Sequence, residues 1–162
     1  MVDLAASNKQ PLEIHSHAGL YKALFENDAF SRLNAQASSN AHFLVDSKVA
    51  RLYASELAQV LKAPSLLLID ATEENKSLEK FSGYVSHLIA RGVRRGDTLI
   101  AVGGGIIQDI TCFLGATLLR GLDWHFYPTT LLAQADSCIG SKSSVNVGDA
   151  KNILGTFTPP RE

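Results

Sequence analysis

The sequence predicts an α/β fold in which a mostly parallel, Rossmann-like sheet carries helices on both faces. Short apolar runs alternate along the chain with longer segments of helical periodicity, which is the pattern of β–α–β units. Several of these runs are apolar throughout, as strands covered on both faces must be. The length of 162 residues corresponds to one domain.

The strands are predicted from the apolar runs and the polar or proline residues that end them. Four strands are expected at 41–46, 65–70, 98–102 and 124–127. Nearer the N-terminus the pattern is less regular, and it favours a strand at 12–17, then a helix and a polar link at 38–40.

Three helices are predicted after these strands. The first covers 52–61 and stops before Pro64, and the second covers 81–89. The second ends at Arg91-Gly92, where a cationic last turn precedes a helix-stopping glycine. The third is expected at 106–119, directly after three glycines.

The composition excludes several classes of protein. Fifteen Lys and Arg residues face sixteen Asp and Glu residues, whereas a nucleic-acid-binding protein normally has a basic excess. No stretch approaches the roughly 20 apolar residues of a membrane span, and the first residues do not form a signal sequence. Cys112 and Cys138 lack CxxC spacing. We therefore expect a cytoplasmic protein with two reduced thiols and no nucleic-acid or membrane partner.

The most informative local pattern is Gly103-Gly104-Gly105 between a predicted strand and a predicted helix. Such a turn presents bare amides and the positive end of the helix dipole, where a phosphate or diphosphate can bind. The pattern is not GxGxxG, because Gln108 occupies the last small-residue position. A tight strand-to-helix turn without a ligand is the alternative.

Two further groups follow predicted strands at their carboxyl ends, where open parallel sheets bind ligands. Thr129 and Thr130 come after Pro128 and offer two hydroxyls for another part of the same cofactor, with helix capping by Thr130 as the alternative. Glu73 and Lys76 follow the second strand. A glutamate there can accept from ribose hydroxyls, although a solvated loop explains both residues equally well.

Residues 137–152 are rich in Ser, Gly, Asn and Asp and have little apolar periodicity. A polar stretch of this length inside a domain usually has a function. Its lysines, amides and neighbouring carboxylate suit a phosphorylated, hydroxyl-rich ligand, or else they form an exposed charged loop. These residues are Asp136, Lys142, Asn146, Lys151 and Asn152.

The five histidines show neither HxxxH nor HExxH spacing. His15 and His17 share one face if their segment is a strand, but two ligands do not make a zinc site. We expect no complete metal site within this chain. No GxSxG nucleophile elbow is present either.

Taken in order, the motifs resemble those of 3-dehydroquinate synthase and its sugar phosphate cyclase relatives. The resemblance covers about sixty residues at near-constant spacing, and 71–79 resembles that family's adenosine loop more loosely. The matching motifs are Gly103-Gly104-Gly105-Ile106-Ile107-Gln108-Asp109, Leu119-Arg120-Gly121, 127–137, Gly140-Ser141-Lys142, Val145-Asn146 and 151–157.

The resemblance implies an enzyme that uses NAD as a recycled redox cofactor together with a divalent metal, zinc or cobalt. Such enzymes oxidise a hydroxyl of a phosphorylated seven-carbon sugar, eliminate phosphate, reduce the ketone again and close a carbocycle by aldol addition. In the family a helical second domain supplies a glutamate and two histidines for the metal, and the protein is a homodimer. We accordingly expect 1–158 to be the NAD-binding α/β domain and 159–162 to begin the connector to that second domain. The isolated chain should then be inactive.

The resemblance also implies roles for individual residues. Arg120 resembles an arginine that reaches the phosphate of the neighbouring subunit's substrate. Substrate binding and catalysis are expected of Asp136, Lys142, Asn152 and Arg120. Cofactor contacts are expected of Glu73, Lys76, Gly104, Gly105, Asp109, Thr129, Thr130, Leu132, Ser137 and Lys151, the last beside the substrate as well.

The chain departs from the family pattern at several positions, which bear on the substrate more than on the cofactor. Gln108 stands where the family usually has glycine, Ala71-Thr72 replaces Asp-Gly, and three serines replace the Gly and Thr-Gly around Lys142. A cyclase acting on a different sugar phosphate, in secondary or surface-polysaccharide metabolism, is therefore an alternative. So is an NAD-dependent polyol dehydrogenase of the glycerol type, which should lack Lys142 and Lys151-Asn152. A non-enzymatic nucleotide-sensing module is the third interpretation.

Overall fold

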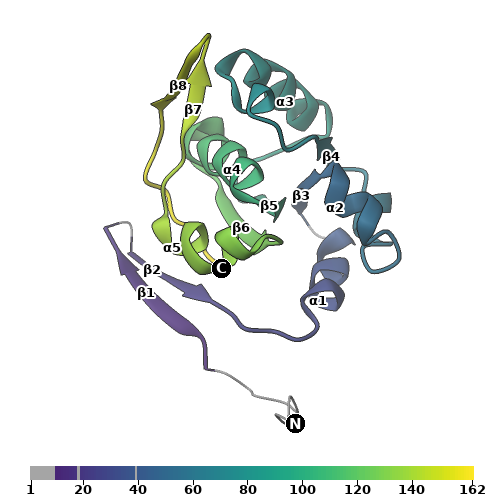
Figure 1. Ribbon diagram of the computed structural model, residues 1–162. Coiled ribbons are helices and arrows are strands. Elements are labelled where there is room, and N and C mark those ends of the chain that lie inside the picture. Colours follow the sequence, from purple (N-terminus) through teal and green to yellow (C-terminus); the bar gives the residue numbers. More distant parts are fainter. Residues whose placement is uncertain (1–9, 18, 39) are drawn as a thin grey trace.

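The computed structural model describes residues 10–162 except positions 18 and 39, so part of the predicted link at 38–40 lies outside the described residues. Its centre is a sheet of four parallel strands in the order β4–β3–β5–β6 (Figure 1). These strands are β3 (Ala41–Asp46), β4 (Leu66–Ile69), β5 (Thr98–Gly103) and β6 (Asp123–Pro128). The predicted fold class is confirmed.

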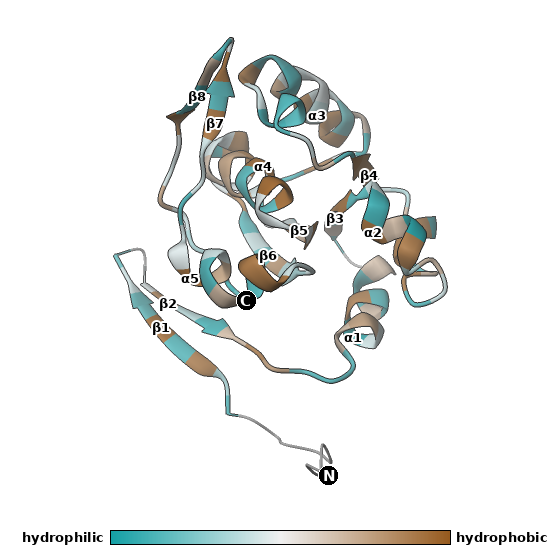
Figure 2. Cartoon of the chain, viewed as in Figure 1, coloured by the Kyte–Doolittle hydropathy of each residue, from teal (hydrophilic) through white to brown (hydrophobic). Residues whose placement is uncertain are grey.

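Helices cover both faces of this sheet (Figure 1). On one face α3 (Leu78–Ala90) and α4 (Gly105–Thr117) pack over Leu44 and Ala101. On the other, α1 (Ala29–Ala35) and α2 (Ser47–Leu52) pack over Val45 and Val102. Neighbouring strand residues thus enter opposite cores, which is why β3 and β4 are mostly apolar and largely brown in Figure 2.

The predicted helix at 52–61 is not one helix. α2 ends at Leu52, turns follow, and a 3₁₀ helix, η2 (Val60–Lys62), closes the segment. Leu57 and Val60 are fully buried in the core on that face. Their helical spacing therefore reflects burial of successive turns against the same core rather than continuous α-helix.

α4 ends two residues earlier than the sequence predicts. A 3₁₀ turn, η4 (Leu118–Arg120), follows it, and Leu119 and Arg120 both have left-handed backbone conformations with φ of 53° and 70°. The apolar pattern of α4 runs on into this turn, so periodicity alone could not place the helix end.

Two hairpins lie outside the central sheet. β1 (Leu12–Ser16) pairs with β2 (Gly19–Ala23), and of these the sequence predicts only the first. β7 (Val145–Val147) pairs with β8 (Ala150–Leu154) inside the polar stretch and lies beside α3 and α4 (Figure 1). Every residue of β8 is exposed and β7 has only three residues, of which Val145 and Asn146 are buried, so the pattern is too short to predict the hairpin.

The last residues lie along the free edge of β6. Arg161 N donates to Trp124 O over 2.8 Å, Phe126 N donates to Glu162 O over 2.8 Å, and Lys22 N of β2 donates to Arg161 O over 3.2 Å. Residues 161–162 therefore link the β1–β2 hairpin to the central sheet. The domain boundary at residue 158 stays a prediction.

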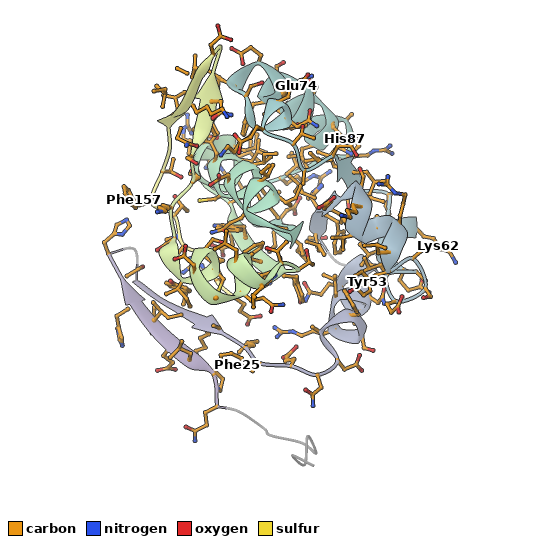
Figure 3. All side chains as sticks on the ribbon, viewed as in Figure 1. Phe25, Tyr53, Lys62, Glu74, His87 and Phe157 are labelled. Carbon is orange, nitrogen blue, oxygen red and sulfur yellow. The ribbon has the colours of Figure 1, made fainter. Side chains whose placement is uncertain are left out.

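The remaining short elements follow α1, β4 and β6. These are a 3₁₀ turn after α1, η1 (Gln36–Ser38), a 3₁₀ turn after β4, η3 (Glu74–Lys76), a π-helical turn, η5 (Ala133–Ser137), and a short helix, α5 (Cys138–Gly140). Phe157, labelled in Figure 3, meets the ring of His17 edge to face, with ring centroids 6.2 Å apart. Both cysteines are free thiols, Cys112 buried and Cys138 partly so. Among the described residues, no helix has the length and apolarity that crossing a bilayer requires.

Candidate functional site

The glycine turn (Gly103-Gly104-Gly105) and the threonine turn (Pro128-Thr129-Thr130) lie side by side at the carboxyl edge of the sheet. Gly103 is in register with Pro128, and Thr129 N donates to Gly103 O over 2.9 Å. A Cβ on Gly104 would lie 3.1 Å from Thr130 Cγ2, so the two turns are in van der Waals contact. Both turns follow parallel strands that end level with each other, which brings residues 25 positions apart into one site.

The first turn of α4 is open to a ligand. Its N-cap residue is Gly104, and no side chain among the described residues caps it. Gly105 is exposed, and an added Cβ there would meet no described atom within 4 Å. The free amides and the helix dipole therefore face open space, the arrangement that binds phosphate groups.

The two threonines have different surroundings. Thr130 Oγ1 accepts a hydrogen bond from Ala133 N over 3.2 Å and so caps the turn that follows. Thr129 Oγ1 is buried without a hydrogen-bond partner among the described residues, and the same holds for Ser137 Oγ. Buried hydroxyls are nearly always paired, so these two fit the polar groups of a bound cofactor.

A second polar cluster surrounds the Lys76 ammonium group, which η3 places after β4. Lys76 is only 5% exposed. Its Nζ lies 3.2 Å from Asp109 Oδ2, 3.0 Å from Asn152 Oδ1 and 3.4 Å from Ser144 Oγ. Glu73 Oε1 is 3.6 Å away. The structure therefore unites three predicted cofactor residues with Asn152, a predicted substrate residue.

Asp109 anchors this cluster to α4. Its carboxylate accepts from Ser144 N over 2.9 Å and from Ser144 Oγ over 3.0 Å. Burial raises the pKa of Asp109, while Lys76 and the Ser144 hydrogen bonds act in the opposite direction. The carboxylate thus depends on its partners to remain ionised.

Glu73 is hydrogen-bonded to the β7–β8 hairpin. Asn146 Nδ2 donates to Glu73 Oε2 over 3.0 Å, and this hydrogen bond lowers the pKa of Glu73, as do the charges of Lys76 and Lys151. Asn146 is 5% exposed, and its Oδ1 accepts from Asn152 N over 2.9 Å. Asn146 therefore connects the loop after β4 with β8.

The other predicted residues lie around these clusters or apart from them. Lys142 and Lys151 are exposed, and Lys142 forms an isolated bridge with Phe157. Asp136 on η5 and Leu132 are exposed as well, Leu132 by 71%. Arg120 lies beyond the far end of α4, about 20 Å from the glycine turn at 1.5 Å per helical residue, and so does not join the site.

Asp46 belongs to the same edge, although the sequence indicates only that it ends a strand. It ends β3, between β4 and β5, and its Cβ would lie 3.3 Å from a Cβ built on Gly103. Its Oδ1 accepts from Lys48 N over 2.8 Å. The sequence signal that could have placed Asp46 in the site is an acidic residue at the end of an apolar strand, since parallel strands end at the same edge as the glycine turn.

A metal site was not expected within this chain. Among the described residues, no group of three or more His, Cys, Asp or Glu side chains is placed to hold an ion. No chemical step is therefore assigned to a metal held by these residues.

An open parallel sheet whose carboxyl edge carries a glycine turn at a bare helix N-terminus defines a Rossmann-like α/β domain. Residues 66–162 match the family described as 3-dehydroquinate synthase N-terminal, and the chain belongs to that family.

Curated relatives agree with this assignment. The chain is 42% identical over 128 residues to the 3-dehydroquinate synthase of Xylella fastidiosa (strain M12), covering 75% of this chain and 35% of the relative. It is 42% identical over 139 residues to that of Acidithiobacillus ferrooxidans (strain ATCC 53993 / BNL-5-31), covering 82% and 38%. The chain thus spans little more than a third of the length of these relatives.

Solved structures of sugar phosphate cyclases have the same fold. A 2-deoxy-scyllo-inosose synthase complexed with carbaglucose-6-phosphate, NAD+ and Co2+ matches with a TM-score of 0.79 at 25% identity, over 93% of this chain and 44% of that one. The 2-epi-5-epi-valiolone synthase of Streptomyces hygroscopicus subsp. jinggangensis 5008, with NAD+ and Zn2+ bound, matches at 0.67 and 32% identity, over 80% and 39%. A glycerol dehydrogenase of Schizosaccharomyces pombe, at 0.52 and 21% over 82% and 33%, shares the fold alone.

Proposed function

We propose that this chain is the NAD-binding part of a sugar phosphate cyclase similar to 3-dehydroquinate synthase. The observation that carries the proposal is the contact between the glycine turn and the threonine turn beside the uncapped start of α4. The two cyclase structures described above contain NAD+, which supports the same cofactor here.

In this proposal NAD lies across the carboxyl ends of all four strands. Neighbouring strands are about 4.8 Å apart, so the edge from β4 to β6 spans about 14 Å. The diphosphate would meet Gly104 and Gly105, with the adenosine on the side of Glu73 and Lys76. Asp46, at the middle of the edge, would accept from ribose hydroxyls.

The nicotinamide half would lie on the other side, near Leu132 and the hydroxyls of Thr129 and Ser137, which have no hydrogen-bond partner among the described residues. When bound, NAD supplies the hydride acceptor for an oxidation that is later reversed. Asp109, which pairs with Lys76, would meet the diphosphate and its ribose, with Lys151 beside the cofactor and the substrate. Thr130 would contribute mainly through the cap that it provides.

The substrate in this proposal is a phosphorylated seven-carbon sugar. Lys142 would bind its phosphate or carboxylate as a point charge, while Asp136 and Asn152 would take its hydroxyls. Oxidation acidifies the neighbouring C–H bond, so phosphate elimination, re-reduction and aldol closure can follow. We place the metal-binding residues outside this chain, treat 159–162 as the start of a connector to them, and expect the chain alone to be inactive.

Arg120 fits a role in a homodimer. It is exposed and lies far from the glycine turn of its own chain, so it is available to the phosphate site of a second subunit. A cyclase for another sugar phosphate remains the second candidate, favoured by the 32% identity with the valiolone synthase. Lys142 and the Lys151-Asn152 pair disfavour a polyol dehydrogenase, whose substrate carries no anionic group.

Calorimetry with NAD tests the cofactor assignment on the full-length protein. Gly105→Leu places a side chain in open space at the start of α4, where the diphosphate would lie. The matched control, Gly83→Leu, also places a leucine in open space, but on α3 and away from the diphosphate. We expect at least about tenfold weaker binding for Gly105→Leu and unchanged binding for Gly83→Leu, because only the first blocks the helix N-terminus. Equal affinity in both variants would remove the cofactor assignment.

The substrate class is tested by phosphate release. The full-length protein is incubated with NAD, a divalent metal and seven-carbon sugar phosphates that either carry or lack a C1 carboxylate. Phosphate release from the sugar with a C1 carboxylate supports the dehydroquinate reaction. Phosphate release only from the sugar that lacks this carboxylate supports the second candidate, a cyclase for another sugar phosphate. Oxidation of an unphosphorylated polyol without phosphate release would contradict both.

A further inference from the structure

The segment between β6 and β7 has little packing of its own. It consists of the π-helical turn η5, the short helix α5 and an extended stretch that leads to Ser144. Of residues 131–142, all of which are described, only Ala133 is buried. Yet this segment carries Asp136 and Lys142, so their positions depend on contacts with other elements.

Two consecutive residues of α4 hold this segment at two points. Gln108 Nε2 donates to Ser137 O over 2.6 Å, and Asp109 accepts from Ser144 N over 2.9 Å. Successive side chains on a helix point about 100° apart, so one residue reaches η5 while the next reaches the entry to β7. Lys142 lies between the two anchored points.

A third hydrogen bond comes from the β1–β2 hairpin. The Tyr21 hydroxyl donates to Ile139 O over 2.5 Å, and Tyr21 is 3% exposed. It reaches α5 from the opposite side to α4, and it acts two residues after Ser137. Ala133 of η5 packs in the same core as α4, and among the described residues the hydrogen bond from Gln108 joins the η5 backbone to that helix.

The burial of Gln108 is unusual for a residue that serves stability alone. Its side chain is 2% exposed, yet Oε1 has no hydrogen-bond partner among the described residues. An unpaired buried amide oxygen costs free energy and offsets much of what the bond from Nε2 contributes. An apolar side chain of the same size would therefore fold about as well, whereas it could not hold Ser137.

We propose that Gln108 is a positioning residue, whose hydrogen bond to Ser137 O fixes the Asp136–Lys142 segment against the first turn of α4 and thereby sets the affinity for the phosphorylated substrate. The substrate part of this inference rests on the proposed function. The structural part, that Gln108 immobilises the segment, does not.

Hydrogen exchange on the full-length, ligand-free protein tests the structural part. Gln108→Met keeps the length of the side chain and removes the hydrogen bond. We expect backbone amides within 137–142 to exchange about five to ten times faster, as for the loss of one hydrogen bond, at an unchanged urea midpoint. The matched control is Thr117→Val, which removes the bond from Thr117 Oγ1 to Phe113 O at the other end of α4 and should leave 137–142 unaffected.

A second variant tests the same hydrogen bond in case Gln108→Met does not fold. In Gln108→Leu the side chain is shorter than methionine and also has no group that can donate to Ser137 O, so exchange in 137–142 should rise again. Unchanged exchange in this segment for a folded variant of either kind overturns the proposal.

The substrate part is tested by separating three constants. In Gln108→Met the KM for the sugar phosphate should rise about tenfold, while kcat stays within about twofold. The Kd for NAD should rise less than the KM, because Ser137 is only one of the proposed NAD contacts and the glycine turn is untouched. A loss of NAD affinity as large as the rise in KM, or an unchanged KM with faster exchange, overturns the positioning role. If the wild-type protein neither binds NAD nor releases phosphate, the proposed function fails, and the exchange data alone then decide whether Gln108 holds the segment.

Discussion

Replacing Lys76 by methionine removes the charge at the centre of the polar cluster and keeps the length of the side chain. Lys76 is 5% exposed, and its Nζ has oxygens of Asp109, Asn152 and Ser144 within 3.4 Å. The variant leaves the Asp109 carboxylate, whose side chain is 18% exposed, without its cationic partner. The central consequence is therefore an unpaired buried charge.

The expected loss of stability is about 3 kcal/mol. Breaking a buried ion pair from one side costs about 3–5 kcal/mol, and the lower end applies because Asp109 keeps both hydrogen bonds from Ser144. Removing Lys76 also raises the pKa of Asp109 further above its ordinary value, since the charge that lowers it is gone. An acid with a raised folded-state pKa loses relative stability as the pH rises, so the deficit should be larger at pH 7 than at pH 4.

Urea unfolding at both pH values measures this loss. Trp124 is the chain's single tryptophan and is 1% exposed, so its fluorescence reports unfolding of the core. The control is Lys80→Met, which breaks an exposed ion pair of 3.1 Å with Glu74 and should cost less than about 0.5 kcal/mol.

A double variant identifies the cause of the loss. In Lys76→Met with Asp109→Leu no buried charge is left unpaired, and a coupling free energy of about 2 kcal/mol is expected. The reasoning is refuted if Lys76→Met loses no more than Lys80→Met, or if the losses of the two single variants simply add.

Three further changes follow from other contacts. In Gly103→Ala the new Cβ would lie 2.5 Å from Ile107 Cγ1, so overpacking should cost about 2 kcal/mol in urea unfolding. Asn146→Leu removes the hydrogen-bond partner of Glu73 Oε2 and of Asn152 N. At about 1 kcal/mol for each buried hydrogen bond, it should lower the free energy of unfolding by about 2–3 kcal/mol. A decrease below about 0.5 kcal/mol would contradict a stabilising role of these bonds. Burial lowers the pKa of His125, so the wild type should lose stability as the pH falls below about 6.5, and His125→Phe should lose less between pH 7.5 and 5.5 by urea midpoint.

The sequence alone determined the central sheet. The apolar runs and their polar ends predict β3, β4, β5 and β6 to within two residues, because strands that face two cores are mostly apolar. The neighbourhood of the glycine and threonine turns follows from the same pattern, since parallel strands end at one edge. Thr130 was predictable as a ligand contact or as a cap. The tertiary structure shows the capping hydrogen bond from Ala133 N, and the contact with a ligand stays a prediction.

Tertiary structure alone decided how the polar stretch is folded and which side chains meet. Within the β7–β8 hairpin only Val145 and Asn146 are buried, so its strands leave no clear period in the sequence. Hydrogen bonds from Asn146 to Glu73 and from Ser144, just before β7, to Asp109 hold the hairpin in place. Lys76 and Asn152 meet although 76 positions separate them. Local pattern reports the burial of each residue, whereas a cluster of partnered charges depends on where distant segments are brought together.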